Sequence, residues 1–219
     1  MVSKDEDYNH LENDTTQLQQ WKGTFGRDYI KRNIYNEWML DKGTDAFGKM
    51  LKGINYESAL EVGSSIGMNL KFLTSITNDD VKLYAIEPNE EAYSKLCDDD
   101  SIRLKQAWNC SAYQIPLPDA SIDLVFTKGV LIHISPKDLK KATDEIIRVA
   151  KRFILCVEYF SHTPEMVEYR GKSNLLFKRD FGSYYLDNYH NLSCIAYGFL
   201  WQRDYKIFDN LNWWLFQKK

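Results

Sequence analysis

The sequence has few residues that could hold a metal ion or form a disulfide framework. Its 219 residues include only four histidines and four cysteines, the latter at Cys97, Cys110, Cys156 and Cys194. No C-x-x-C pair occurs, and the histidines lack the short spacing typical of zinc ligands. We therefore expect no metal site and no disulfide bonds, and we interpret Cys156, inside an apolar run, as a small core residue.

Long apolar segments and basic runs are also missing. Apolar stretches are only strand length, and residues 1–7 are polar, so neither a membrane span nor a signal peptide is predicted. The net charge of −3 and a pI near 5.8 argue against nucleic acid as the main partner. We expect a soluble cytoplasmic protein without nucleic-acid or membrane partners, in which 44% hydrophobic residues can bury one large core.

The N-terminal quarter of the chain is predicted to be a tail followed by helices. Residues 1–18 are polar and acidic without a repeating apolar face, which predicts a flexible tail. Residues 19–219 are expected to form a single domain that begins with a helical cap over 19–53. In that cap, apolar residues at helical spacing predict a helix from Arg27 to Asp41 and a second one capped by Thr44.

Strand-like and helix-like segments alternate through the middle of the chain. The predicted strands are 58–62, 82–87, 102–107, 122–127 and 153–158, and the predicted helices are 68–76, 90–96 and 136–149, the last capped by Ser135. This alternation predicts an α/β fold with a mostly parallel sheet and right-handed crossovers. Two further runs, 193–199 and 212–217, predict an antiparallel C-terminal hairpin that completes seven strands.

A glycine-punctuated loop after the first predicted strand is the most informative segment. Gly63 and Gly67 allow a tight turn and the close approach of a ligand, and Glu87 ends the next strand twenty residues beyond Gly67. A carboxylate there binds ribose hydroxyls in nucleotide-binding α/β folds. The dinucleotide fingerprint would need glycines at Ser65 and Met68, and no G-K-[ST] follows. A nucleotide-type cofactor other than a dinucleotide is favoured; an ordinary turn is the alternative.

Several motifs resemble those of known methyltransferases. The spelling E-x-G-x-x-x-G from Glu61 to Gly67 resembles the first motif of class I S-adenosylmethionine (SAM)-dependent methyltransferases, although Ser65 stands where that family often has a third glycine. Ile115–Val125 is similar to their "LPFPDNSFDLV" segment and Val130–Ile134 to the following "VLHHI". Segments at 21–33, 126–134, 169–182 and 197–204 look like the pseudaminic acid biosynthesis-associated methylases, a name that reflects gene neighbourhood in sugar-modification clusters.

This resemblance implies a Rossmann-like class I methyltransferase fold, SAM as cofactor and S-adenosylhomocysteine (SAH) as product. The N-terminal helices would close over the cofactor, and the arginine there would pair with its methionyl carboxylate. The residues implied to bind the cofactor are Trp21, Tyr29, Arg32, Glu61, Gly63, Ser64, Gly67, Glu87, Ser111, Ala112 and Lys128.

Residues with catalytic potential follow the fourth and fifth predicted strands. Lys128 and His133 lie at the carboxyl end of the sheet, where such folds keep their chemistry, and Tyr159 follows the fifth strand. His133 could act as a base toward a hydroxyl acceptor, or it could only pack under the loop; both interpretations stay open.

Segment 161–191 mixes aromatic and cationic residues and is the predicted acceptor-pocket segment. Tyr169, Arg170, Lys178 and Arg179 would suit an acidic small molecule, such as a nonulosonic acid or a sugar nucleotide. The alternative is a solvated face in which Arg179 pairs with Asp180.

The leading prediction is methyl transfer from SAM to an oxygen or nitrogen of a small carbohydrate-type metabolite, by a monomer or homodimer. One alternative is an NAD(P)-dependent reductase, which Ser65 and Met68 disfavour. Another is a homologue that binds the cofactor without catalysis. RNA or protein methylation is disfavoured by the acidic composition and by the lack of a D/N-P-P-Y motif.

Overall fold

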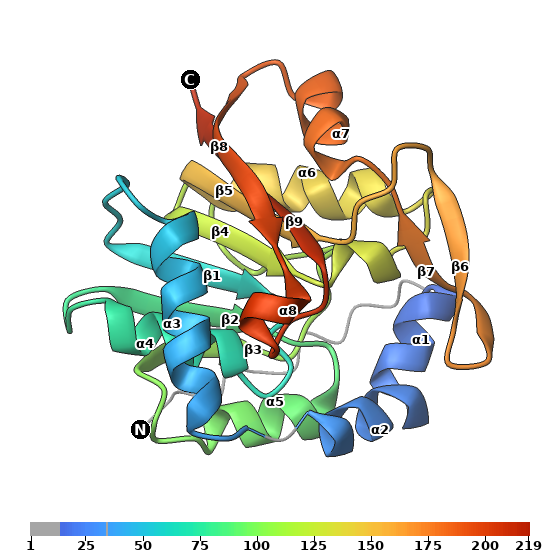
Figure 1. The fold of residues 1–219 in the computed structure, drawn as a ribbon, viewed down its shortest axis with the longest axis horizontal. Coiled ribbons are helices and arrows are strands. Elements are labelled where there is room, and N and C mark those ends of the chain that lie inside the picture. Colours follow the sequence, from blue (N-terminus) through green and yellow to red (C-terminus); the bar gives the residue numbers. More distant parts are fainter. Residues whose placement is uncertain (1–13, 34) are drawn as a thin grey trace.

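A seven-stranded sheet forms the centre of the computed structural model, which describes residues 14–33 and 35–219. Its strands are β1 (Ser58–Val62), β2 (Lys82–Ile86), β3 (Leu104–Trp108), β4 (Ile122–Lys128), β5 (Ala150–Glu158), β8 (Leu192–Leu200) and β9 (Leu211–Lys218). They lie in the order β3-β2-β1-β4-β5-β9-β8, with β1 to β5 parallel and β8 and β9 antiparallel (Figure 1). The predicted mostly parallel sheet with an antiparallel C-terminal hairpin is confirmed.

Helices cover both faces of this sheet (Figure 1). They are α3 (Trp38–Met50), α4 (Met68–Ile76), α5 (Glu90–Cys97), α6 (Leu139–Val149), α7 (Phe181–Asn188) and the short α8 (Gln202–Tyr205). Neighbouring residues of β4 point to opposite faces, so Phe126 joins one hydrophobic cluster with Phe47 and Phe72, whereas Val125 joins another with Ile146. Burial on both faces explains why β4 reads as a continuous apolar run. Cys156 is a free, buried core residue, as expected.

The N-terminal helices differ from the expectation. Helix α1 (Thr16–Lys22) begins inside the predicted tail, so the boundary at residue 18 is too late; residues 1–13 lie outside the described part. The single helix expected from Arg27 to Asp41 is wrong, because α2 (Thr24–Arg32) ends at Asn33, whose side-chain amide donates to Tyr29 O at 2.8 Å. The expected N-cap Thr44 lies within α3, where its hydroxyl donates to Leu40 O.

The start of α6 also differs from the expectation. The helix begins at Leu139, with Asp138 rather than Ser135 in the N-cap position and no side-chain capping bond, because a 3₁₀ turn, η1 (Leu131–His133), and a further turn occupy the preceding residues. Its predicted apolar stripe is confirmed, since Leu139, Ala142 and Ile146 are buried.

Segment 161–191 contains a β-hairpin that the sequence pattern did not reveal. Strands β6 (Glu165–Tyr169) and β7 (Lys172–Lys178) pair antiparallel around the two-residue turn Arg170-Gly171, and α7 follows. Both turn residues have positive φ, 52° and 71°, as a tight hairpin turn of the primed type requires. The hairpin lies beside α1, far from the edge strand β3 in the sheet (Figure 1).

Within the described residues, no helix is long and apolar enough to cross a membrane.

Candidate cofactor site and active site

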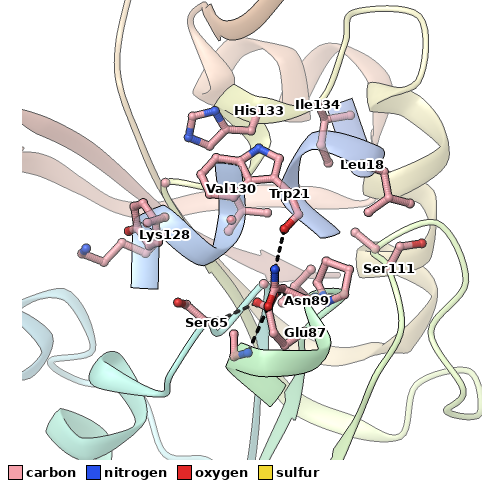
Figure 2. Close-up of a pocket in the computed structure, with 18 of the residues that line it drawn as sticks. Leu18, Trp21, Ser65, Glu87, Asn89, Ser111, Lys128, Val130, His133 and Ile134 are labelled. Carbon is pink, nitrogen blue, oxygen red and sulfur yellow. Dashed lines mark hydrogen bonds between the residues drawn. The ribbon is translucent and has the colours of Figure 1, made fainter. Parts of the chain in front are cut away.

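A pocket lies at the carboxyl ends of β1, β2 and β4, beneath α1 and α2 (Figure 2). It encloses about 830 Å³ of empty space, its mouth included. The lining residues are Leu18, Trp21, Gly26, Tyr29, Ile30, Val62, Gly63, Ser65, Glu87, Pro88, Asn89, Ala92, Ser111, Ala112, Tyr113, Lys128, Gly129, Val130, His133 and Ile134. Open α/β sheets bind their ligands at this end of the strands.

The loop between β1 and α4 has an unusual backbone. Gly63 and Gly67 have φ of 74° and 80°, and a Cβ on Gly67 would come within 2.5 Å of the Leu96 and Ile102 side chains. Both positions therefore require glycine. Ser65 also has a positive φ, 49°, so a serine here adopts the conformation for which a glycine is commonly used.

Glu87 holds this loop from the neighbouring strand. Its carboxylate accepts hydrogen bonds from Ser65 N at 2.7 Å and from Asn89 N at 2.8 Å (Figure 2). Burial raises the pKa of Glu87 to about 7, and the two backbone hydrogen bonds act against that rise. A carboxylate has about four acceptor positions. Two are used by the backbone, which leaves about two for hydroxyl groups of a ligand.

Glu61 is a buried carboxyl group with one oxygen unsatisfied. Asn69 donates to its Oε1 at 2.6 Å, but Oε2 has no hydrogen-bond partner among the described residues. Burial raises the pKa of Glu61 to about 8, opposed by the Asn69 hydrogen bond and the positive charge of Lys128. A buried acceptor without a donor is costly, so this position fits an N–H group supplied by a ligand.

Lys128 lies at the end of β4 and contributes a half-buried cation to the pocket. Its ammonium is 4.4 Å from the centre of the Phe208 ring. Burial lowers the pKa of Lys128, and the negative charges of Glu61, Glu158 and Asp209 counteract this. The group is well placed to meet an anion.

His133 faces helices α1 and α2, which cover the pocket and are called the lid below. Its Nδ1 lies 2.6 Å from Leu175 O on β7; because a carbonyl only accepts, Nδ1 carries the proton and Nε2 is left as an acceptor. The His133 ring is 4.5 Å from the Trp21 ring (Figure 2) and 5.4 Å from that of Tyr169. Burial lowers the pKa of His133 to about 4, so the ring is neutral at pH 7.

Glu158, at the end of β5, holds the turn that carries His133. It is fully buried and accepts hydrogen bonds from Val130 N and Leu131 N, both at 3.1 Å. Burial raises the pKa of Glu158 to about 7, against the effect of these bonds. We refer to Glu61, Glu87 and Glu158 as the three buried carboxyl groups.

Comparison with known proteins identifies the chemistry. Residues 60–163 match the model of a family described as a methyltransferase domain. The protein is a SAM-dependent methyltransferase. Its cofactor is SAM and its product from the cofactor is SAH. No curated protein sequence matches the chain.

Solved structures of low sequence identity share the fold. Magnesium protoporphyrin IX methyltransferase from Synechocystis PCC 6803 with bound SAH is 12% identical with a TM-score of 0.69, over 94% of this chain and 100% of that one. A SAM-dependent methyltransferase from Leishmania major is 15% identical with a TM-score of 0.67, over 94% and 87%. Burkholderia thailandensis 1,6-didemethyltoxoflavin-N1-methyltransferase is 12% identical with a TM-score of 0.65, over 89% and 83%. The Rossmann-like methyltransferase fold is thereby confirmed.

The methyltransferase brings most of the predicted cofactor residues to the pocket. Those that line it are Trp21, Tyr29, Gly63, Glu87, Ser111, Ala112 and Lys128. Glu61, Ser64 and Gly67 shape the loop from outside the lining. Arg32 is exposed at the end of α2 and does not line the pocket, whereas Ile30, on the inner face of the same helix, does.

The structure separates the predicted acceptor residues. Tyr169 lies against His133, and Lys178 lies 5.5 Å from the Tyr159 ring, whose hydroxyl donates to the Asp209 carboxylate. Tyr159 itself is not among the pocket-lining residues.

Of the four residues predicted to bind the acceptor, the two arginines lie elsewhere. Arg170 is exposed at the hairpin turn, and Arg179 lies 5.1 Å from the Tyr184 ring on α7. Asp180 caps α7 by accepting from Ser183 N. The four residues therefore do not form one cluster, although the Arg170 guanidinium lies 5.7 Å from the Tyr169 ring beside it.

Some pocket residues were not predicted from the sequence. Asn89 is the clearest case, since it lines the pocket and caps α5 through a bond from Ala92 N at 3.0 Å. An asparagine directly before Glu90-Glu91 is the ordinary signal of a helix N-cap. Gly26, Ile30 and Val130 gave no comparable signal, because lid and loop contacts depend on the fold.

Proposed function

We propose that this methyltransferase transfers the methyl group of SAM to an oxygen or nitrogen of a small carbohydrate-type metabolite that carries an acidic group. Nonulosonic acids and sugar nucleotides are acceptors of this class. The main support for SAM as the cofactor is the Glu87 carboxylate. Ser65 N and Asn89 N donate to it, and it can still accept hydrogen bonds from about two hydroxyl groups.

The pocket offers partners for each part of SAM in this proposal. Glu87 would accept the two ribose hydroxyls, and Ser111 and Ala112, on the same side of the pocket, would border the adenine ring. The orphaned Oε2 of Glu61 would accept from the methionyl ammonium. Lys128, rather than the exposed Arg32, would then meet the methionyl carboxylate.

SAM supplies an electrophilic methyl group on a sulfonium. The residues of the chain have to hold the acceptor in line with that group and keep water away. Trp21 and Tyr29 close the pocket from the lid, with ring centres 5.3 Å apart. Their faces also suit a neighbouring positive charge.

His133 would assist a hydroxyl acceptor. In the tautomer fixed by Leu175 O, Nε2 can accept the proton that the hydroxyl loses. With a pKa of about 4 the ring is available as an acceptor at neutral pH and releases the proton readily. For an amine acceptor no strong base is required, and His133 would then serve only as a hydrogen-bond acceptor.

The acceptor would enter between the lid and the β6–β7 hairpin. Tyr169 there contacts both Phe25 and His133, so its ring could pack on a sugar face. Lys178 and Tyr159 lie on the same inner side and could bind an acidic group. We propose these three as acceptor residues and place Arg170 and Arg179 at the periphery.

Two measurements test this proposal. Titration calorimetry with SAH and with NAD separates a methyltransferase from a reductase, since only SAH should bind. Incubation of the enzyme with methyl-labelled SAM and extracts of its own cells, followed by mass spectrometry, should reveal a labelled acidic sugar. A labelled neutral metabolite, RNA or protein would refute the proposed acceptor class, and no labelled product would favour a homologue without catalysis.

A further inference from the structure

The Asn89 side chain, at the N-terminus of α5, fastens the end of helix α1. The Asn89 amide nitrogen donates to Trp21 O at 2.8 Å and to Lys22 O at 3.3 Å (Figure 2). These are carbonyls of the last turn of α1, where a helix has no backbone donors of its own to satisfy them. Asn89 is 3% exposed, so these bonds are shielded from water.

The same residue is bonded to the cofactor carboxylate and to its own helix. Its backbone N–H donates to Glu87 Oε1, and its side-chain oxygen accepts from Ala92 N. Glu87, the N-terminus of α5 and the end of α1 therefore meet at one buried asparagine. A chain of hydrogen bonds therefore connects the Glu87 carboxylate with α1.

The lid is built closely around this contact. A Cβ on Gly26, in α2, would come within 1.9 Å of Trp21 O and 2.7 Å of the Asn89 amide nitrogen. Only glycine lets α2 pass over the bonded carbonyl. The other end of α1 is held separately, by Gln17 Nε2 donating to Asn174 O of the hairpin at 3.0 Å.

We propose that Asn89 is a positioning residue that holds the α1–α2 lid closed over the cofactor and so sets Trp21 against His133. Its amide acts on the lid and its oxygen acts only as a helix cap. The role in cofactor retention depends on the function proposed above, whereas the closing of the lid does not.

Two substitutions of Asn89 separate the two roles. Asn89→Ser keeps a side-chain acceptor for Ala92 N, and therefore the cap, but its shorter side chain cannot place a donor where the Asn89 amide nitrogen meets Trp21 O. Asn89→Ala loses both. If the amide clamps the lid, Asn89→Ser should resemble Asn89→Ala in lid opening and cofactor release, and resemble the wild type in thermal stability.

Gly26→Ala tests the clamp from the opposite side. Its new methyl group would collide with both Trp21 O and the Asn89 amide nitrogen, and so break the clamp, while residue 89 remains an asparagine. We expect faster lid opening from this variant as well. Because residue 89 is unchanged, this result could not be attributed to a folding defect caused by substitution at position 89.

The measurements are limited proteolysis and SAH release. Trypsin can cleave the lid after Lys22, Arg27 and Lys31, and we expect about tenfold faster cleavage there in Asn89→Ser than in the wild type without cofactor, and a similarly faster release of SAH in a chase experiment. Equal cleavage and release in Asn89→Ser and wild type would overturn the clamp, and so would a defect confined to Asn89→Ala, which would show a cap alone. If the wild type does not bind SAH, the proposed cofactor site fails, while the cleavage rates still decide whether Asn89 holds the lid.

Discussion

Replacing Glu87 with alanine should weaken cofactor binding more than any other single change in the ribose region. The structure leaves about two acceptor positions on this carboxylate after Ser65 N and Asn89 N are bonded. Hydrogen bonds to a charged group contribute about 1.5 to 3 kcal/mol each, less what water can replace in the opened site. We therefore expect a loss of about 2 to 3 kcal/mol, which is roughly a 30- to 150-fold higher Kd.

Titration calorimetry with SAH at pH 8 measures this effect, since the Glu87 pKa of about 7 leaves the carboxyl mostly ionised there. Glu91→Ala is the matched control, because Glu91 is on the nearby α5 but pairs with Lys95 at the surface. Thermal melting of each variant must accompany the titrations, because alanine also leaves Ser65 N and Asn89 N without their acceptor. A folded Glu87→Ala variant that binds SAH as tightly as the wild type would refute the ribose assignment.

Further predictions concern the cation, the imidazole and the buried carboxyl groups. Lys128→Met should raise the Kd for SAH about tenfold while Arg32→Ala leaves it unchanged; the reverse pattern would contradict our placement of the methionyl carboxylate. His133→Ala should lower an O-methylation rate about 100-fold with little change in SAH affinity, and an unaffected rate would leave His133 structural. The pKa values of the three buried carboxyl groups are raised, so near neutral pH the folded protein binds more protons at these groups than the unfolded chain does. The melting temperature of the free protein should therefore fall as the pH rises from 6.5 to 8. Glu158→Gln should reduce that fall, and His133, whose pKa is lowered, acts in the opposite direction only below about pH 6.5.

Local sequence patterns predicted the central sheet well and the N-terminal helices poorly. The strands β1, β4 and β5 are buried on both faces, which makes each an apolar run that can be read without knowledge of its neighbours. The break at Asn33 could not be predicted in this way, since the apolar spacing continues through it, and the side-chain bond from its amide to Tyr29 O is visible only in the structure. The turn Arg170-Gly171 was missed because arginine is an unusual residue at positive φ.

The same distinction holds for the site. The loop from Gly63 to Gly67 and the carboxylate at Glu87 are local features of two strand ends, so their place in the pocket could be predicted from their spacing. Arg32 shows the limit of that approach, because one helix face cannot be told from another until the docking of α2 is known. Asn89 could be predicted as a cap, but its bonds to Trp21 and Lys22 join residues more than sixty positions apart.

The local contacts belong mostly to the side of the site proposed for the methyl donor, and the distant contacts belong mostly to the side proposed for the methyl acceptor. SAM would be held mostly by strand ends, and the parallel sheet sets their geometry. This explains why the SAM site could be predicted from the sequence. The proposed acceptor side lies between the lid and the β6–β7 hairpin. Gln17 of α1 donates to Asn174 O of the hairpin, and His133 Nδ1, on η1, is bonded to Leu175 O of the hairpin. These bonds place Trp21, His133 and Tyr169 against one another only when both elements are docked. Acceptor specificity should therefore change with substitutions in the lid or hairpin that leave SAH affinity intact, and Tyr169 is the residue at which the two elements meet.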